Sequence, residues 1–227
     1  MKPRMALKII VDIAMTVALM FLMTYELIGR AIHEWIGVFM LVLFLFHHAL
    51  NVKWSQNVLK GRYTSLRLLQ LILVAGSLVC MMGSMISGVV LSEHVFAFLS
   101  IRSGQSWART WHLLCSYWGF VMMSLHLGFH WSVIMVMIKK HFGESFRMRT
   151  WILRTFAAGI AVYGDFAFEK REIGSYMLRN SEFVFFDFEE PLVFFFIDYI
   201  TVMGLFVFIG HYLAKLLKYH YPKRKTL

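Results

Sequence analysis

The sequence predicts an all-α, polytopic membrane protein with six transmembrane helices, and three observations support this fold class. Hydrophobic residues make up 59% of the 227 residues and aromatic residues 17%. Six stretches approach the roughly 20 apolar residues that a helix needs to cross a bilayer. Basic residues concentrate between alternate stretches. Because lipid cannot satisfy backbone polar groups, these stretches should be helices and not open strands.

The predicted spans follow one another with short connections. The first two are joined near Gly29–Ala31 and should form a tight antiparallel hairpin, and the third carries Gly76, Gly83 and Gly88, small residues that let membrane helices approach closely. We expect one integral-membrane domain with a core at about 7–138, a further helix pair at about 151–217 and an outer loop at 165–191. The six spans are approximately Leu7–Ile28, Ile32–Trp54, Leu66–Leu91, Trp107–Ile138, Trp151–Phe168 and Leu192–Leu217.

The net charge of +10 has a distribution that predicts topology. Alternate junctions hold 17 of the 23 basic residues, and by the positive-inside rule both termini should lie in the cytoplasm, with the chain in the cytoplasmic (inner) membrane. The excess charge favours anionic lipid over nucleic acid as a partner. These basic residues are Lys2, Arg4, Lys8, Lys53, Lys60, Arg62, Arg67, Lys139, Lys140, Arg147, Arg149, Arg154, Lys215, Lys218, Lys223, Arg224 and Lys225.

Two predicted spans each carry a pair of histidines fourteen residues apart: His33 with His47, and His112 with His126. Fourteen helical residues rise about 21 Å, and their direction differs by only about 40° from four full turns. Both spans should run from outside to inside, so the two pairs match in depth. Imidazole is an axial ligand of haem iron. This pattern predicts a four-helix core that holds two haems, the outer between His33 and His112 and the inner between His47 and His126.

Neighbouring residues leave alternatives within this site. His48 or His130 could replace its neighbour as the inner ligand, since each lies within one helical turn of it. Gly119 lies midway between His112 and His126, where it would leave room for a macrocycle or simply serve helix packing. Arg30 and Arg109 stand one turn before the outer histidines, where they could pair with haem propionates or simply mark the interface.

Several further residues are candidates for supporting roles. Asp12 and Asp198 are carboxylates inside predicted spans, suited to proton exchange, to neutralising a base or to hydrogen bonding between helices. His94 should be solvated or near a haem edge. Cys80 and Cys115 form no CxxC or CxxCH motif, so any haem should be b-type and non-covalent. The phenylalanine-rich and acidic run 181–191 could be an aromatic belt, a lid or a docking surface.

These motifs give the chain a resemblance to the flavinylation-associated cytochrome family, over essentially its whole length. More distantly it resembles the cytochrome b subunits of formate dehydrogenases and hydrogenases. The resemblance implies a di-haem, bis-histidine bundle that passes electrons to extracytoplasmic proteins carrying covalent flavin. The residues that carry it are His33-Glu34-Trp35-Ile36-Gly37, Phe46-His47-His48-Ala49-Leu50-Asn51, Trp111-His112, Leu125-His126-Leu127-Gly128-Phe129-His130-Trp131 and Phe188-Glu189-Glu190-Pro191.

The sequence therefore predicts a di-haem b-type cytochrome that moves electrons across the cytoplasmic membrane. A quinol or a cytoplasmic reductase would be the donor and an extracytoplasmic flavoprotein the acceptor. One alternative is a self-sufficient quinone or superoxide oxidoreductase. The other is a haem-free metal or proton transporter, although the chain has no HExxH motif. The oligomeric state, the partners and the direction of electron flow do not follow from the residues.

Overall fold

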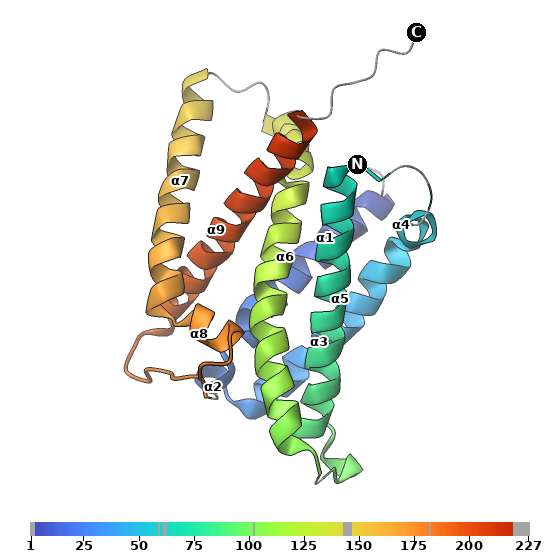
Figure 1. The fold of residues 1–227 in the computed structure, drawn as a ribbon, viewed down its shortest axis with the longest axis vertical. Coiled ribbons are helices and arrows are strands. Elements are labelled where there is room, and N and C mark those ends of the chain that lie inside the picture. Colours follow the sequence, from blue (N-terminus) through green and yellow to red (C-terminus); the bar gives the residue numbers. More distant parts are fainter. Residues whose placement is uncertain are drawn as a thin grey trace. The chain divides into compact units, whose positions relative to one another are not determined.

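The computed structural model describes residues 3–58, 60, 63–101, 103–142, 147–181 and 183–219. In this part of the chain all regular structure is helical, which confirms the all-α class (Figure 1). The helices are α1 (Pro3–Leu22), α2 (Tyr25–Ile28), α3 (Arg30–Leu50), α4 (Val52–Asn57), α5 (Ser65–Leu91), the short 3-10 helix η1 (Ala97–Leu99), α6 (Gln105–Phe142), α7 (Arg147–Lys170), α8 (Ile173–Met177) and α9 (Leu192–Tyr219).

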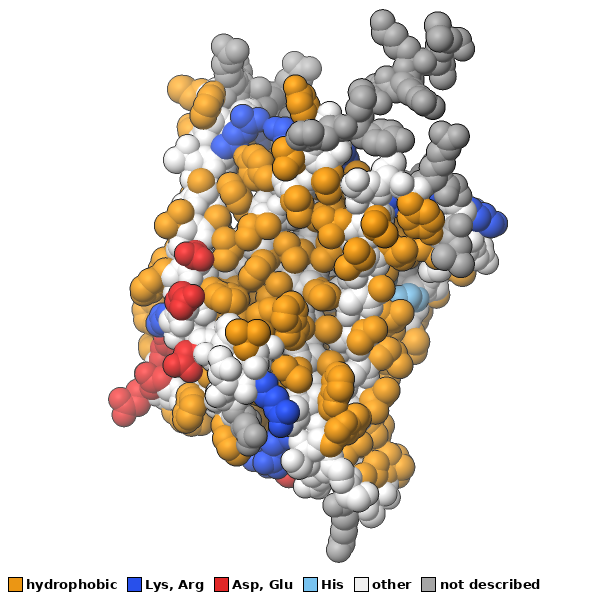
Figure 2. Space-filling model, viewed as in Figure 1, with side chains coloured by type: hydrophobic (Ala, Val, Ile, Leu, Met, Phe, Trp, Pro, Cys, Tyr) orange, Lys and Arg blue, Asp and Glu red, His pale blue; other side chains and the backbone are white. Residues whose placement is uncertain are grey.

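Five of the described helices are long and apolar enough to cross a membrane: α1, α3, α5, α6 and α9. Apolar side chains cover most of the face drawn in Figure 2, as expected for a surface in contact with lipid. These helices identify a multi-pass membrane protein. The sixth predicted span, residues 151–168, forms part of α7, which does not join the five because charged residues such as Arg154 and Asp165 interrupt its apolar sequence.

Part of the charge pattern used to predict topology lies outside the described residues. This applies to Lys2, Arg62, Lys223, Arg224 and Lys225, and to Glu182 in the outer loop. The side chains of Lys139, Lys140 and Arg147 are likewise outside the described part, although their backbone is helical.

The chain falls into two compact units, each assembled from separate segments. Unit 1 comprises Met1–Gly61, Val79–Tyr117 and Ser175–Phe196, and unit 2 comprises Arg62–Leu78, Trp118–Gly174 and Ile197–Leu227. Both α5 and α6 contribute to both units. The single-domain organisation, with a 7–138 core and a 151–217 helix pair, stays a prediction.

Unit 1 contains the predicted antiparallel hairpin of α1 and α3. Gly29 precedes α3 with a φ of +85°, a left-handed conformation that favours glycine at this tight connection. The two helices bury Met15, Met40 and Phe44. At the other end, Lys8 Nζ donates to Asn51 Oδ1 over 2.7 Å.

In the same unit, glycine allows α5 to lie close to α6. A Cβ atom on Gly83 would collide with Cys115 Sγ. This close approach supports the packing role predicted for that glycine.

Unit 2 contains close helix contacts of the same kind. Gly128 of α6 and Gly210 of α9 face each other, and a Cβ on Gly210 would come within 2.6 Å of the Leu125 carbonyl oxygen. On α7, a Cβ on Gly164 would collide with the carbonyl oxygen of Thr201 in α9. Small residues therefore bring backbones together at both contacts, as is usual between membrane helices. Figure 1 shows α7 beside α9.

Candidate functional site

The predicted outer histidines come together in unit 1. His33 on α3 and His112 on α6 are both half-buried, and their ring centres lie 6.0 Å apart with an interplanar angle of 67°. An imidazole nitrogen binds a transition-metal ion at about 2 Å, so two rings bound to one ion from opposite sides have centres about 6 Å apart. The spacing of this pair therefore suits two ligands of a single metal ion.

Hydrogen bonds to α5 define the protonated nitrogen of His112. Its Nδ1 lies 3.0 Å from the Ser84 carbonyl oxygen and 3.2 Å from Ser87 Oγ. The buried Ser87 hydroxyl itself donates to the Gly83 carbonyl over 2.6 Å, so it is available to accept from His112. Nδ1 therefore carries the hydrogen, and Nε2 keeps a lone pair that can bind a metal. In histidines that bind metals, the ring nitrogen that does not bind the metal generally makes a hydrogen bond of this type.

His33 has an unsatisfied polar atom. Its Nδ1 is buried and makes no hydrogen bond to the described residues, although the Leu22 backbone interacts with the ring, and the ring of Tyr25 lies against it edge-on at 5.0 Å between centres. Buried polar side-chain atoms nearly always have a partner, so an orphaned one calls for a physical explanation such as an additional ligand. Together with the His112 lone pair, this atom fits a site for a group with a metal ion at its centre.

His47, the predicted inner ligand on α3, contacts a carboxylate of the neighbouring helix α1. Its Nδ1 lies 2.8 Å from Asp12 Oδ1 on α1. The Asn51 side-chain amide donates to the His47 carbonyl oxygen over 2.9 Å, and its Oδ1 accepts from Lys8 Nζ. Asn51 therefore connects this end of α3 to α1 as well. The carboxylate–imidazole contact favours a proton on Nδ1 and a free Nε2, as in carboxylate–histidine–metal triads. Asp12 therefore has the hydrogen-bonding role between helices that was one of its predicted alternatives.

The other inner-site candidates have different surroundings. His48 Nδ1 donates to the Phe44 carbonyl one turn earlier, at 3.0 Å. His126 and His130 lie together on α6 in unit 2, with ring centres 4.8 Å apart. His47 belongs to unit 1 and His126 to unit 2. The pairing of these two histidines, and the choice between His126 and His130, stay predictions.

The remaining predicted residues have the following places. Arg30 is exposed and donates from Nη1 to both carboxylate oxygens of Glu93, at 3.0 and 3.2 Å. Arg109 is exposed on α6, and Gly119 is half-buried on the same helix, midway in the sequence between His112 and His126. A role of Arg30 or Arg109 in binding propionates stays a prediction.

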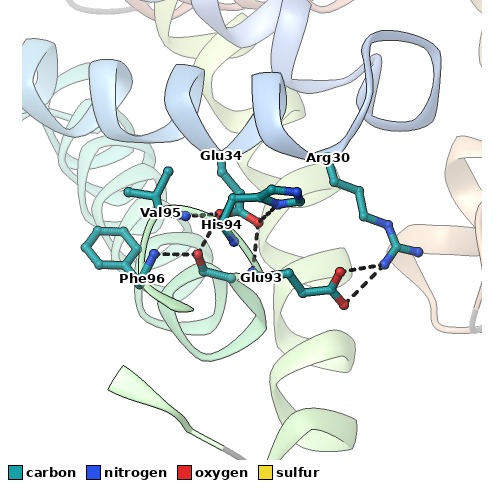
Figure 3. Close-up of polar contacts among 7 residues, drawn as sticks. Arg30, Glu34, Glu93, His94, Val95 and Phe96 are labelled. Atoms are coloured by element: carbon teal, nitrogen blue, oxygen red, sulfur yellow. Dashed lines mark hydrogen bonds and ion pairs between the residues drawn. The ribbon is translucent and has the colours of Figure 1, made fainter. Parts of the chain in front are cut away.

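Sequence reasoning missed the part played by Glu34, which follows His33 on α3. Its carboxylate reaches the segment after α5 and accepts hydrogen bonds there (Figure 3). In the sequence, Glu34 stood out only as part of the motif His33-Glu34-Trp35-Ile36-Gly37. Its place beside a candidate ligand, on the outer turn of a span, was the available signal. The loop that it binds lies about 60 residues further along the chain, and spacing does not reveal such a contact.

Asp198, the second intramembrane carboxylate, neutralises nearby bases in unit 2. It is only 1% exposed and accepts hydrogen bonds from Lys170 Nζ, Arg171 Nε and the Tyr163 hydroxyl, each at 2.8 Å. This agrees with the base-neutralising alternative predicted for it. The contacts connect α9 with the end of α7.

No protein-family model, curated protein or solved structure matches the chain. Within the described ranges, His, Cys, Asp and Glu side chains form no group of three or more arranged to hold a metal ion. A site with two protein ligands, such as bis-histidine haem ligation, needs only a pair. The arrangement that the structure does bring together is His33 with His112.

Proposed function

We propose that this protein is a di-haem b-type cytochrome that conducts electrons across the cytoplasmic membrane. The observation that carries the proposal is the His33–His112 pair: two half-buried imidazoles on different apolar helices, 6.0 Å apart between centres. One of them has its Nδ1 occupied by α5, and the other has a buried Nδ1 without a partner among the described residues. A pair of polar rings with these properties is costly in lipid unless it binds a ligand.

The inner site of the proposal comprises His47 and His126. His48 is the alternate for His47, and His130 is the alternate for His126. Its support is the fourteen-residue spacing on α3 and α6 together with the contact between His47 and Asp12. A carboxylate that orients a histidine in this way is a frequent companion of a metal ligand.

The residues of the chain have defined tasks in this proposal. When bound, the haems supply one-electron redox chemistry, and the protein supplies ligation, orientation and a low-dielectric surrounding. The Ser84 carbonyl fixes the tautomer of His112, and Asp12 fixes that of His47. The apolar exteriors of α1, α3, α5, α6 and α9 keep the site in the bilayer. We further propose that α7 is a sixth crossing and that both termini are cytoplasmic.

The proposed donor is a membrane quinol or a cytoplasmic reductase, and the proposed acceptor is an extracytoplasmic flavin-bearing protein. The acceptor rests on the family resemblance and on the exposed phenylalanines of the outer loop. Phe183, Phe185 and Phe188 are 61%, 79% and 72% exposed, and Asp187 and Glu189 are exposed beside them. Exposed aromatic side chains outside the apolar helices are typical of contact surfaces.

Optical spectroscopy tests the proposal. Protein purified from cells that make haem should show reduced b-type bands with dithionite, and pyridine extraction should give two haems per chain. His33→Ala and His112→Ala should each lose one and the same haem. Asp187→Asn is the control, since Asp187 is exposed in the outer loop and is not a candidate haem ligand. Colourless protein, or two haems in either outer variant, would contradict the proposal.

A second set of variants identifies the inner ligands. His47→Ala should lose the inner haem while the outer one remains. His126→Ala and His130→Ala separate the two candidates on α6, because only the variant of the true ligand should lose that haem. If His48→Ala loses the inner haem in place of His47→Ala, then His48 is the ligand on α3.

A further inference from the structure

Glu34 connects α3 to the segment that follows α5 by an unusually dense set of hydrogen bonds. Its side chain is 14% exposed. Oε1 accepts from the Glu93 backbone N–H at 2.9 Å and lies 3.2 Å from His94 Nδ1. Oε2 accepts from the Ser92 hydroxyl at 2.6 Å and from the backbone N–H groups of His94 and Val95 at 3.1 and 2.7 Å. Figure 3 shows this carboxylate pointing from α3 into the loop.

The loop itself is braced around this contact. The Ser92 hydroxyl that donates to Glu34 also accepts from the Phe96 backbone N–H at 2.8 Å. Successive backbone N–H groups that converge on a carboxylate form a rigid anion-binding nest. Charge-assisted hydrogen bonds of this type are the strong ones. The position of α3 at its outer turn is therefore fixed relative to the end of α5.

The same helix, α5, also fixes His112. The Ser84 carbonyl and the Ser87 hydroxyl both face His112 Nδ1. Both members of the outer pair are therefore held by α5 and the segment that follows it. His112 bonds to α5 directly, and His33 is held through Glu34, the next residue, which bonds to the segment after α5. Neither imidazole contacts the other through a hydrogen bond, so their separation depends on this shared support.

We propose that Glu34 is a positioning residue that sets the distance and the ring angle between His33 and His112. This inference rests on the proposed function, in which that pair holds the outer haem. Glu34 contacts neither the cofactor nor the reacting atoms. It acts through the backbone of α3, and removing its charge loosens His33 relative to His112 while the α1–α3 contact at His47 remains.

The test compares Glu34→Gln with the matched control Glu93→Gln in otherwise unchanged haem-loaded protein. Glu93 follows Ser92 in the sequence, but its carboxylate pairs with Arg30. The side chains of Glu93 and Arg30 are both more than half exposed. An exposed ion pair contributes little, and the backbone N–H that Glu93 gives to Glu34 is retained in the control. The readout is the low-spin ferric EPR spectrum, whose g values respond to the angle between the two imidazole planes. The outer signal is assigned with His33→Ala.

The expected result is a shift of the outer haem's g values and a lower outer-haem content in Glu34→Gln, with the inner signal unchanged. Glu93→Gln should match the parent. Parent-like outer signals in Glu34→Gln would overturn the inference, and so would equal shifts of both haems, because they would indicate a general loss of structure. If Glu34→Gln cannot be purified, Ser92→Ala removes one donor to the same carboxylate and is judged by the same criteria.

A second measurement separates this inference from the proposed function. If the parent protein carries no haem, the proposed function fails, and copper(II) alone then serves as a probe of the histidine pair. Binding that disappears in His112→Ala defines the outer site. Weaker copper(II) binding at that site in Glu34→Gln than in Glu93→Gln supports the positioning role, and equal binding overturns it.

Discussion

At the residue scale, the candidate ligands His112 and His47 differ in the group that their Nδ1 atom faces. His112 donates to a neutral backbone carbonyl of α5, whereas His47 faces the carboxylate of Asp12. A negative charge on the far side of a ligand makes the imidazole a stronger electron donor to a bound metal. The two proposed haems should therefore have different potentials, and the protein itself supplies the difference.

Asp12→Asn should raise the potential of the inner haem. The amide oxygen can still accept from His47 Nδ1, but loss of the charge favours the reduced form, which carries one positive charge less. A tenfold change in the equilibrium is about 60 mV for one electron, and we expect a shift of that order in an optical redox titration. Asp187→Asn, an exposed outer-loop variant, is the control. An unchanged or lower inner potential in Asp12→Asn would contradict this role.

Asp198→Asn should destabilise the protein strongly. The substitution removes the charge that pairs with Arg171, whose side chain is 13% exposed, and it weakens the contacts to Lys170 and Tyr163. Removing one partner of a buried ion pair costs about 3–5 kcal/mol. Lys170 is 40% exposed, so solvent screening places the loss nearer the lower value. A lower unfolding temperature in detergent than for Asp187→Asn is expected, and equal temperatures would contradict the account.

Sequence reasoning located most of these residues but not their partners. Histidine spacing predicted His33 and His112 as a pair, and the structure brings them together. Asp12 and Asp198 stood out because carboxylates are costly in a bilayer. Their partners lie 27 to 35 residues away in the sequence. Such separations carry no periodic signal, so several roles remained open for each carboxylate, and the nest around Glu34 was not foreseen.

At the element scale, the composition of α7 and its contacts in the structure give different indications of whether it crosses the membrane. The 151–168 stretch is helical as predicted and extends from Arg147 to Lys170. Its 24 residues span about 36 Å, enough for the hydrocarbon core. Composition alone leaves it outside the five membrane-spanning candidates, but its end is docked on α9 through Asp198. Partners on another helix can offset the cost of placing charged residues of α7 in a bilayer.

Glycine substitutions on α7 test its packing on α9. Gly164→Ala should destabilise the protein because the new Cβ would meet the Thr201 carbonyl, a backbone atom that cannot move aside cheaply. Gly159→Ala is the matched control on the same helix, since a Cβ there meets nothing within 4 Å. Alanine should even favour the helix there by about 0.5–1 kcal/mol. Thermal unfolding in detergent measures both. Equal effects would show that α7 does not pack on α9 as described.

The breaks between elements were the least predictable features. The first predicted span, 7–28, is divided into α1 and α2, and η1 falls in a segment expected only as a loop. The first break consists of Met23 and Thr24, and no glycine or proline marks it in the sequence. The Thr24 hydroxyl, which donates to the Phe21 carbonyl at 2.6 Å, satisfies a backbone group at this break.

At the scale of the whole molecule, the number of crossings decides where the termini lie. Six crossings place both termini on one side of the membrane, whereas five place them on opposite sides. Basic residues at alternate junctions favour a cytoplasmic location for both. The sequence therefore predicted a multi-pass helical protein correctly, while the sixth crossing stays a prediction because it depends on contacts of α7 and not on its composition.

Reporter fusions measure this topology directly. A fluorescent protein that matures only in the cytoplasm should be active at both the N- and the C-terminus, and alkaline phosphatase should be inactive at both. Fusions at exposed Phe185 in the outer loop should give the reverse pattern. Opposite activities at the two termini would show that α7 does not cross.

The haem content of the purified chain tests the central claim most directly. Quantitative pyridine extraction should give two b-type haems per parent chain, and one each in His33→Ala and His112→Ala, with the same signal missing from both variants. A parent protein without haem, or two haems in either variant, would contradict the account.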